Sequence, residues 1–114
     1  MIELLVIADD LTGAADTGVQ FAKNRISTAV TDLDSLNDDA LWSDFSVLVV
    51  NTSSRHSTPE DSALKVKRVC KAAAKRGVKA FYKKTDSTLR GNIGAELQSF
   101  LRSAGRERVM FIPG

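Results

Sequence analysis

Short apolar runs that alternate with longer helical patterns constrain the fold of this chain more than any other feature. Strand-like runs occur at residues 3–8, 27–32, 46–52, 80–85 and 108–113. The first and third runs are almost continuously apolar, which is typical of central strands in a parallel sheet covered on both faces. The alternation predicts an α/β fold: a doubly wound parallel sheet of Rossmann or flavodoxin type, with about five strands and helices on both faces.

Three of the connections carry helical patterns, from about residue 13 to 23, after Thr58 and after Gly91. Thr58 is a suitable N-cap for the second of these helices, and Gly77 is a suitable residue to end it. The acidic segment 32–44 is compatible with either a short helix or a loop.

Length and composition limit the class of protein. The chain of 114 residues, 43% hydrophobic and 26% charged, suits one globular domain. No apolar run reaches the roughly 18 residues of a membrane-spanning helix, and the N-terminus lacks the pattern of a secretory signal. The single cysteine, Cys70, cannot form an internal disulfide, so we expect a cytoplasmic protein. Cys70 and Trp42 are expected in the core, and the lone His56 in a loop.

The net charge of +2 conceals an uneven distribution of charge. Residues 1–62 carry three basic and eleven acidic side chains, whereas residues 63–114 carry thirteen and three. Most of the excess lies on the helix predicted after Thr58, without the interleaved aromatic residues that stack on nucleic-acid bases. The pattern favours a solvated helix face, and we expect neither a nucleic-acid nor a membrane partner.

Polar clusters follow the first, third and fourth predicted strands. The first cluster lies in "VIADDLTGAADTG" and contains Asp9 and Asp10. Either carboxylate could accept hydrogen bonds from substrate hydroxyls or act as a general base, both could help to hold Mg²⁺, or Asp10 could cap the following helix. The chain contains no G-x-G-x-x-G or G-x-x-x-x-G-K-[ST] phosphate-binding motif.

The other two clusters carry cations. Arg55 lies in "NTSSRHS", and "KKTDSTLRGN" contains Lys84, Asp86, Ser87 and Arg90. Guanidinium groups match carboxylates, and the free N–H groups of a helix beginning near Gly91 would add further capacity for an anion. Because the carboxyl ends of parallel strands share one edge of the sheet, the three clusters are expected to meet there. Carboxylates facing cations indicate a ligand with hydroxyl groups on one side and negative charge on the other, such as a small polyhydroxy acid.

The stretches "ADDLTGAADTG", "NTSSR" and "KKTDSTLRGN" together resemble the N-terminal domain of the four-carbon acid sugar kinase family. The resemblance implies ATP-dependent phosphorylation of a hydroxyl on threonate, erythronate or 3-oxo-tetronate. It implies a catalytic role for Asp10 and substrate-binding roles for a group of residues at the predicted edge: Asp9, Asp10, Arg55, Lys84, Asp86, Ser87 and Arg90. It also implies that ATP and Mg²⁺ are bound by a larger C-terminal domain, which residues 1–114 do not contain.

The resemblance therefore implies that residues 1–114 are a substrate-binding domain, a piece of a two-domain kinase that is inactive alone. Its partners would be the sugar acid, the C-terminal nucleotide domain and, through an exposed sheet edge, a second copy of the chain. One alternative is a non-catalytic sugar-acid-binding or interaction domain. Another is a receiver-type signalling domain, which requires an aspartate at the end of the third strand, where this chain has Asn51 and Thr52.

Overall fold

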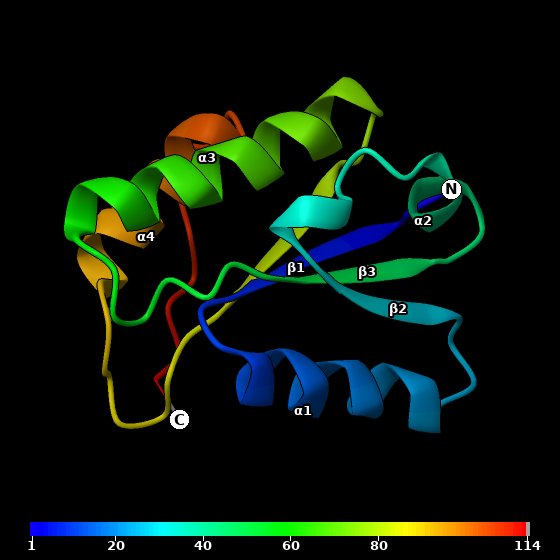
Figure 1. The fold of residues 1–114 in the computed structure, drawn as a ribbon, viewed down its shortest axis with the longest axis horizontal. Coiled ribbons are helices and arrows are strands. Elements are labelled where there is room, and N and C mark those ends of the chain that lie inside the picture. The colour runs from blue at the N-terminus through cyan, green and yellow to red at the C-terminus, as the bar shows by residue number, and fades with distance from the viewer. Residues whose placement is uncertain (114) are drawn as a thin grey trace.

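The computed structural model describes residues 1–113, and a sheet of four parallel strands forms its centre. The strands are β1 (Leu4–Ala8), β2 (Thr28–Asp32), β3 (Val47–Asn51) and β4 (Ala80–Lys84). Their order in the sheet is β2-β3-β1-β4, so that β1 lies between β3 and β4 (Figure 1). The helices are α1 (Leu11–Lys23), α2 (Asp39–Ser43), α3 (Pro59–Lys75) and α4 (Ile93–Ser103), and a 3-10 turn, η1, spans Leu33–Ser35.

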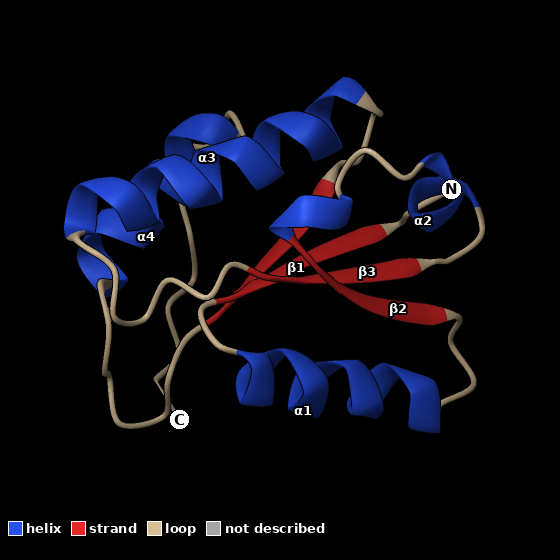
Figure 2. Cartoon of the chain, viewed as in Figure 1, coloured by secondary structure: helices blue, strands red, loops and turns tan. Residues whose placement is uncertain are grey.

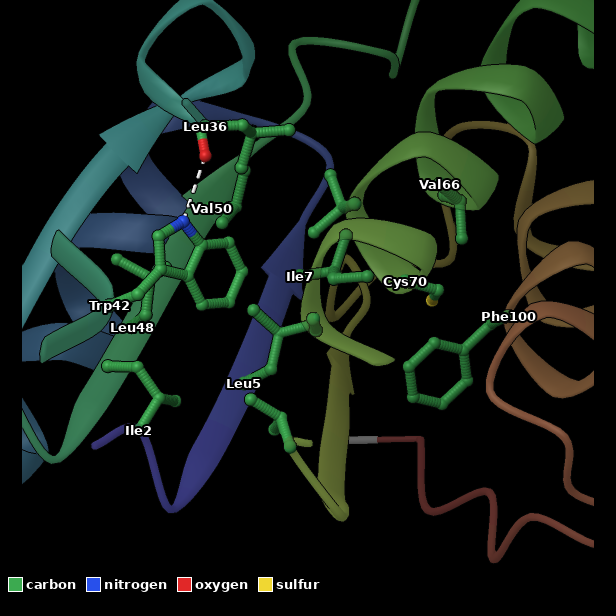
Figure 3. Close-up of a cluster of buried hydrophobic side chains, with 13 residues drawn as sticks. Ile2, Leu5, Ile7, Leu36, Trp42, Leu48, Val50, Val66, Cys70 and Phe100 are labelled. Atoms are coloured by element: carbon green, nitrogen blue, oxygen red, sulfur yellow. Dashed lines mark hydrogen bonds between the residues drawn. The ribbon is translucent and has the colours of Figure 1, made fainter. Parts of the chain in front are cut away.

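Helices cover both faces of the sheet, which confirms the predicted α/β class. Helix α1 lies on one face, and α3 and α4 lie on the other (Figure 2). Alternate residues of the central strands point to opposite layers because the side-chain period of a strand is two. Leu5 and Ile7 belong to the larger core, which Val66 of α3 and Phe100 of α4 complete (Figure 3). Val6, next in sequence to Leu5, belongs to the smaller core beside α1.

The helix boundaries follow local chemistry that is visible in the sequence. The Thr58 hydroxyl accepts a hydrogen bond from the backbone N–H of Asp61 and so caps α3, as predicted. The acidic segment 32–44 contains both η1 and α2. The indole N–H of Trp42 in α2 donates to the Leu36 carbonyl at 2.8 Å inside the core (Figure 3). Cys70 is buried as well, so the predictions for Trp42 and Cys70 are confirmed.

The predicted fifth strand at residues 108–113 is wrong. This segment is exposed and has no strand assignment. A cavity of about 660 Å³ lies between it and β4, lined by Tyr82, Leu97 and Phe111 among others. A strand needs ladder hydrogen bonds and a covering layer, and an apolar run alone supplies neither. Along residues 1–113, no helix is both long enough and apolar enough to span a membrane.

Candidate functional site

The candidate site lies at the carboxyl edge of the sheet, where the connections diverge. From β1 the chain passes through α1 to β2 and β3 on one side, and it returns through α3 to β4 on the other side. Doubly wound sheets bind ligands at such a switch point. The loop after β3 is fastened to the end of β1, because the backbone N–H groups of Thr52 and Ser54 donate to the carbonyls of Ala8 and Asp9 at 2.9 and 3.0 Å.

Arg55 joins carboxylates from two other strand ends. Its Nε and Nη2 donate to the two oxygens of Asp9 at 3.2 and 3.1 Å, which is a bidentate pair. Nη1 lies 3.1 Å from Oδ2 of Asp10, and Nη2 lies 3.4 Å from Oδ1 of Asp86. The hydrogen bond to Asp9 raises the pKa of Arg55 against the opposing effect of burial, and the charges of Asp10 and Asp86 act in the same upward direction. We call Asp9, Asp10, Arg55 and Asp86 the carboxylate cluster.

Asp9 and Asp10 occupy different environments, although they are adjacent in sequence. The Asp9 side chain is only 6% exposed, and Arg55 engages both of its oxygens. The Asp10 side chain is 29% exposed. Its Oδ1 accepts from the backbone N–H of Gly13 at 2.9 Å, so Asp10 is the N-cap of α1. Asp10 is therefore the carboxylate of this pair that a ligand can reach, and capping fixes its orientation.

Asp86 stabilises the turn that follows β4. Its Oδ2 accepts from the hydroxyl and the backbone N–H of Thr88 and from the backbone N–H of Arg90. The Arg90 guanidinium bonds both oxygens, at 2.8 and 2.9 Å. The hydrogen bonds from Arg90, followed by those from Thr88, hold the pKa of Asp86 far below its usual range. Asp86 therefore stays ionised and is poorly suited to accept a proton in catalysis.

Glycine at position 91 allows the loop after β4 to approach the cluster. Gly91 has φ +94°, and a Cβ placed there would lie 2.8 Å from Oδ2 of Asp9 and 3.4 Å from Cγ of Arg55. Any side chain would meet both the unfavourable backbone conformation and the buried ion pair. The glycine in "LRGN" is thus required by the close approach of two loops, which sequence spacing does not reveal.

Lys84 lies beside the cluster with its charge not paired to a carboxylate. Its Nζ donates to the Thr85 carbonyl at 2.6 Å, and no Asp or Glu of residues 1–113 lies within ion-pair distance. A Cβ on Gly13 would lie 2.8 Å from Asp10 Oδ1 and 3.7 Å from Lys84 Cγ, so Lys84 and Asp10 flank the same backbone position. The Lys84 ammonium is therefore available to an anionic ligand near Asp10.

The remaining candidates are placed differently. Arg90 is 64% exposed and reaches the cluster through Asp86. Ser87 is exposed and has no hydrogen bond to the cluster in the described part of the chain; instead it lines the cavity beside β4, together with Lys84. His56 is exposed in its loop, as predicted. The structure thus brings Asp9, Asp10, Arg55, Asp86 and Arg90 together, with Lys84 adjacent, and leaves Ser87 outside.

Sequence reasoning missed Glu96, which is fully buried in α4. Its Oε1 lies 3.0 Å from Nζ of Lys83, and its Oε2 accepts from the Ser54 hydroxyl at 2.9 Å. The sequence does contain a signal for the burial of Glu96, because this residue lies four positions before Phe100, on the apolar face of a predicted helix. A charged residue at such a position needs a buried partner.

The carboxylate cluster does not fit Mg²⁺ or a phosphate group. Within residues 1–113, no group of three or more His, Cys, Asp and Glu side chains is arranged to hold a metal ion. Asp9, Asp10 and Asp86 lie close together, but the Arg55 guanidinium pairs with all three and offsets part of their negative charge. A hard cation such as Mg²⁺ would have to coordinate the same carboxylate oxygens that Arg55 contacts. Carboxylates at the N-terminus of α1 also disfavour a phosphate there.

Comparison with known proteins identifies the family of this chain. The family model of the sugar-binding N-terminal domain matches residues 4–114. The chain is 39% identical to a D-threonate kinase of Salmonella typhimurium over 93% of its own length and 25% of that protein, and 35% identical to a D-erythronate kinase of Heliobacterium modesticaldum over 98% and 26%.

A solved structure has the same fold. It is the crystal structure of a domain of unknown function from Bordetella bronchiseptica, a domain-swapped dimer with bound citrate. It superposes with a TM-score of 0.79 at 36% identity, covering 92% of this chain and 26% of that one. The chain spans about a quarter of the length of these relatives. The family match confirms the resemblance seen in the three motifs, and the chain belongs to the family of sugar-binding N-terminal domains.

Proposed function

We propose that this chain is the sugar-acid-binding domain of a kinase that phosphorylates a hydroxyl of a four-carbon acid sugar such as threonate, erythronate or 3-oxo-tetronate. The observation that carries the proposal is that two unlike groups lie near each other and are open to a ligand. Asp10 is a reachable carboxylate, and Lys84 is a cation that forms no ion pair with a carboxylate among the described residues. The names of the relatives, which include D-threonate, D-erythronate and 3-oxo-tetronate kinases, support the substrate class.

The contacts favour a division of roles within the site. The N–H groups of Arg55 already contact three carboxylates. Its proposed role is therefore to hold these carboxylates together and not to bind the acid group of the ligand. Lys84 and the exposed Arg90 would bind that group. Asp10 retains free lone pairs on both oxygens and would accept the proton of the substrate hydroxyl as general base. Asp9 and Asp86 would support Arg55, and Ser87 would contact the substrate only after rearrangement of its turn.

The phosphoryl donor would come from outside these residues. Kinases generally use ATP with Mg²⁺, and Arg55 already pairs with the carboxylates of the cluster, so we propose that residues 1–114 bind the sugar acid and a further domain binds the nucleotide. In isolation the chain would then bind without phosphorylating. Citrate, a polycarboxylate, in the Bordetella bronchiseptica structure supports an acidic ligand, and the domain swap there supports a second copy as a partner. A cytoplasmic location stays a prediction.

Calorimetric titration tests the proposal. The chain is titrated with D-threonate, with D-erythronate and with 3-oxo-tetronate. The same titrations are then repeated with the variants Lys84→Met and Asp10→Asn. Lys79→Met is the matched control, because it removes the same charge from an exposed residue just before the opposite end of β4. We expect binding that both site variants weaken by about tenfold or more, the factor for one lost charged hydrogen bond, and that the control leaves unchanged.

Two results would refute the proposal. One is a well-folded chain, with native circular dichroism, that binds none of the acids. The other is equal weakening by Lys84→Met and Lys79→Met, which would mean that general positive charge and not a site attracts the anion.

A further inference from the structure

A buried ion pair lies beside the loop that carries Arg55. The side chains of Glu96 in α4 and Lys83 in β4 are only 2% and 3% exposed, and Oε1 and Nζ are 3.0 Å apart. Among the residues that the structure describes, Oε1 accepts no well-aligned hydrogen bond, so the Lys83 charge is what compensates it. Burying two charges is costly, and a well-packed apolar pair commonly stabilises a fold equally well. Stability alone therefore gives a weak reason for this pair.

The pair is connected to the loop that carries Arg55. The Ser54 hydroxyl donates to Oε2 of Glu96 at 2.9 Å and lies 2.7 Å from the hydroxyl of Thr52, whose single proton can go to Ser54 or to the Ala8 carbonyl. The backbone N–H of Ser54 donates to the Asp9 carbonyl at the end of β1. Lys83 also donates to the carbonyl of Lys84. We call Thr52, Ser54, Lys83 and Glu96 the Glu96 network. It links the end of β1, the loop after β3, β4 and α4, which are the elements that border the site.

The same loop contains a residue in an unfavourable conformation. Ser53 has φ +48°, a left-handed value that residues other than glycine adopt only when their surroundings hold them. On one side, the Ser53 N–H donates to Oδ1 of Asn51 at 2.9 Å. On the other side, the next residue is fastened by the Ser54 bond to Glu96. Arg55 follows immediately, so the direction of its side chain depends on both attachments.

We propose that Glu96 and Lys83 are positioning residues for the sugar-acid site. The contact with Lys83 holds Glu96 in place, Glu96 holds Ser54, and Ser54 fixes the backbone from which Arg55 reaches Asp9 and the other carboxylates. None of these groups needs to touch the ligand. The consequence for ligand binding rests on the proposed function, whereas the consequence for Arg55 does not.

The test observes Arg55 directly. Nuclear magnetic resonance of the ¹⁵N-labelled chain measures the hydrogen-exchange rate of its Nε–H, which donates to Asp9. Two variants interrupt the network, Ser54→Ala and the double variant Lys83→Met with Glu96→Met. The double variant Lys83→Met with Glu96→Gln is equally uncharged but retains an acceptor for Ser54. Ser99→Ala is the control, because it removes a hydroxyl of α4 that bonds Ala63 in α3 instead of the loop.

We expect both interrupting variants to speed Nε–H exchange by about tenfold, the factor for losing one hydrogen bond to a charged group. The Glu96→Gln double variant should restore slow exchange, and Ser99→Ala should leave the rate unchanged. Equal exchange in the two double variants, or in Ser54→Ala and the wild type, would overturn the proposal. If the Glu96→Met double variant does not fold, Ser54→Ala decides the question alone.

Calorimetry with D-threonate completes the test. Affinity should fall about tenfold in the interrupting variants and recover in the Glu96→Gln double variant, in parallel with Nε–H exchange. Loss of affinity without faster exchange would overturn the positioning role. If the wild type binds no four-carbon acid while the exchange rates change as expected, the proposed function fails and the positioning of Arg55 stands.

Discussion

Replacement of Arg55 by methionine would leave a buried charge without its partner. The Asp9 side chain, 6% exposed, would lose both bonds of its bidentate pair. Removing one member of a buried ion pair typically costs about 3–5 kcal/mol. Since domains of this kind have unfolding free energies of roughly 5–15 kcal/mol, Arg55→Met is expected to remove a large part of the stability while the apolar core stays intact.

Urea unfolding followed by fluorescence provides the measurement. Trp42 is the single tryptophan of the chain and is buried, with its indole N–H bonded to the Leu36 carbonyl. For a denaturant slope of about 2 kcal/mol/M, a loss of about 4 kcal/mol lowers the midpoint by about 2 M. Asp9→Asn in the Arg55→Met background should recover about 2 kcal/mol of the loss, because the uncompensated charge is gone.

A more exposed ion pair provides the control. Lys65 lies 3.2 Å from Asp61 on the surface of α3, and Lys65→Met should cost at most about 1 kcal/mol. If Arg55→Met lowers the midpoint no more than Lys65→Met does, the carboxylate cluster is not a buried electrostatic unit. Additive effects of Arg55→Met and Asp9→Asn would refute the reasoning equally, because the two residues would then not depend on one another.

Three further outcomes follow from individual groups. Because Arg90 holds the pKa of Asp86 below its ordinary value of 3.8, Asp86 stabilises the fold fully above that value and less as the pH falls beneath it; urea titrations across this range should show the decline, and Asp86→Asn should flatten it. Burial raises the pKa of Cys70 to about 12, so a disulfide reagent at about pH 8 should label the thiol only after unfolding, and rapid labelling of the native chain would contradict its burial. Gly91→Ala should destabilise the fold by about 1–3 kcal/mol, because its Cβ would lie 2.8 Å from a carboxylate oxygen. Gly94→Ala is the comparison: it has open space around it in α4 and should stabilise the fold by about 0.5–1 kcal/mol. Thermal unfolding of both variants measures the difference.

Much of the fold was predictable because its signals are local. Continuous apolar runs marked β1 and β3, the period of two divided their side chains between the layers, and Thr58 marked the start of α3. The rule that parallel strands share a carboxyl edge predicts that the motifs around Asp10 and Arg55 lie close together, as they do. These inferences depend on periodicity, capping and chain direction, which neighbouring residues determine.

The prediction that is wrong, a fifth strand, depends on interactions between distant residues. The apolar run at 108–113 has the composition of a strand. It would need to lie against the free edge of β4 and be covered by another layer, but a cavity separates it from β4. Local sequence does not contain this information. Ser87, in the motif predicted to bind substrate, is exposed and lines the cavity beside β4, and its role stays a prediction.

The sequence by itself determined the α/β class, the sheet edge at which the polar motifs meet and the kinds of charge found there. Only the tertiary structure decided that Asp9 is buried and Asp10 reachable, that Arg55 pairs with three carboxylates from two loops, and that Glu96 lies inside the protein. The physical reason is the difference in range of the interactions. Capping and periodicity act within a few residues, whereas burial and ion pairing depend on which distant segments the packing of the sheet brings within about 3–4 Å of one another.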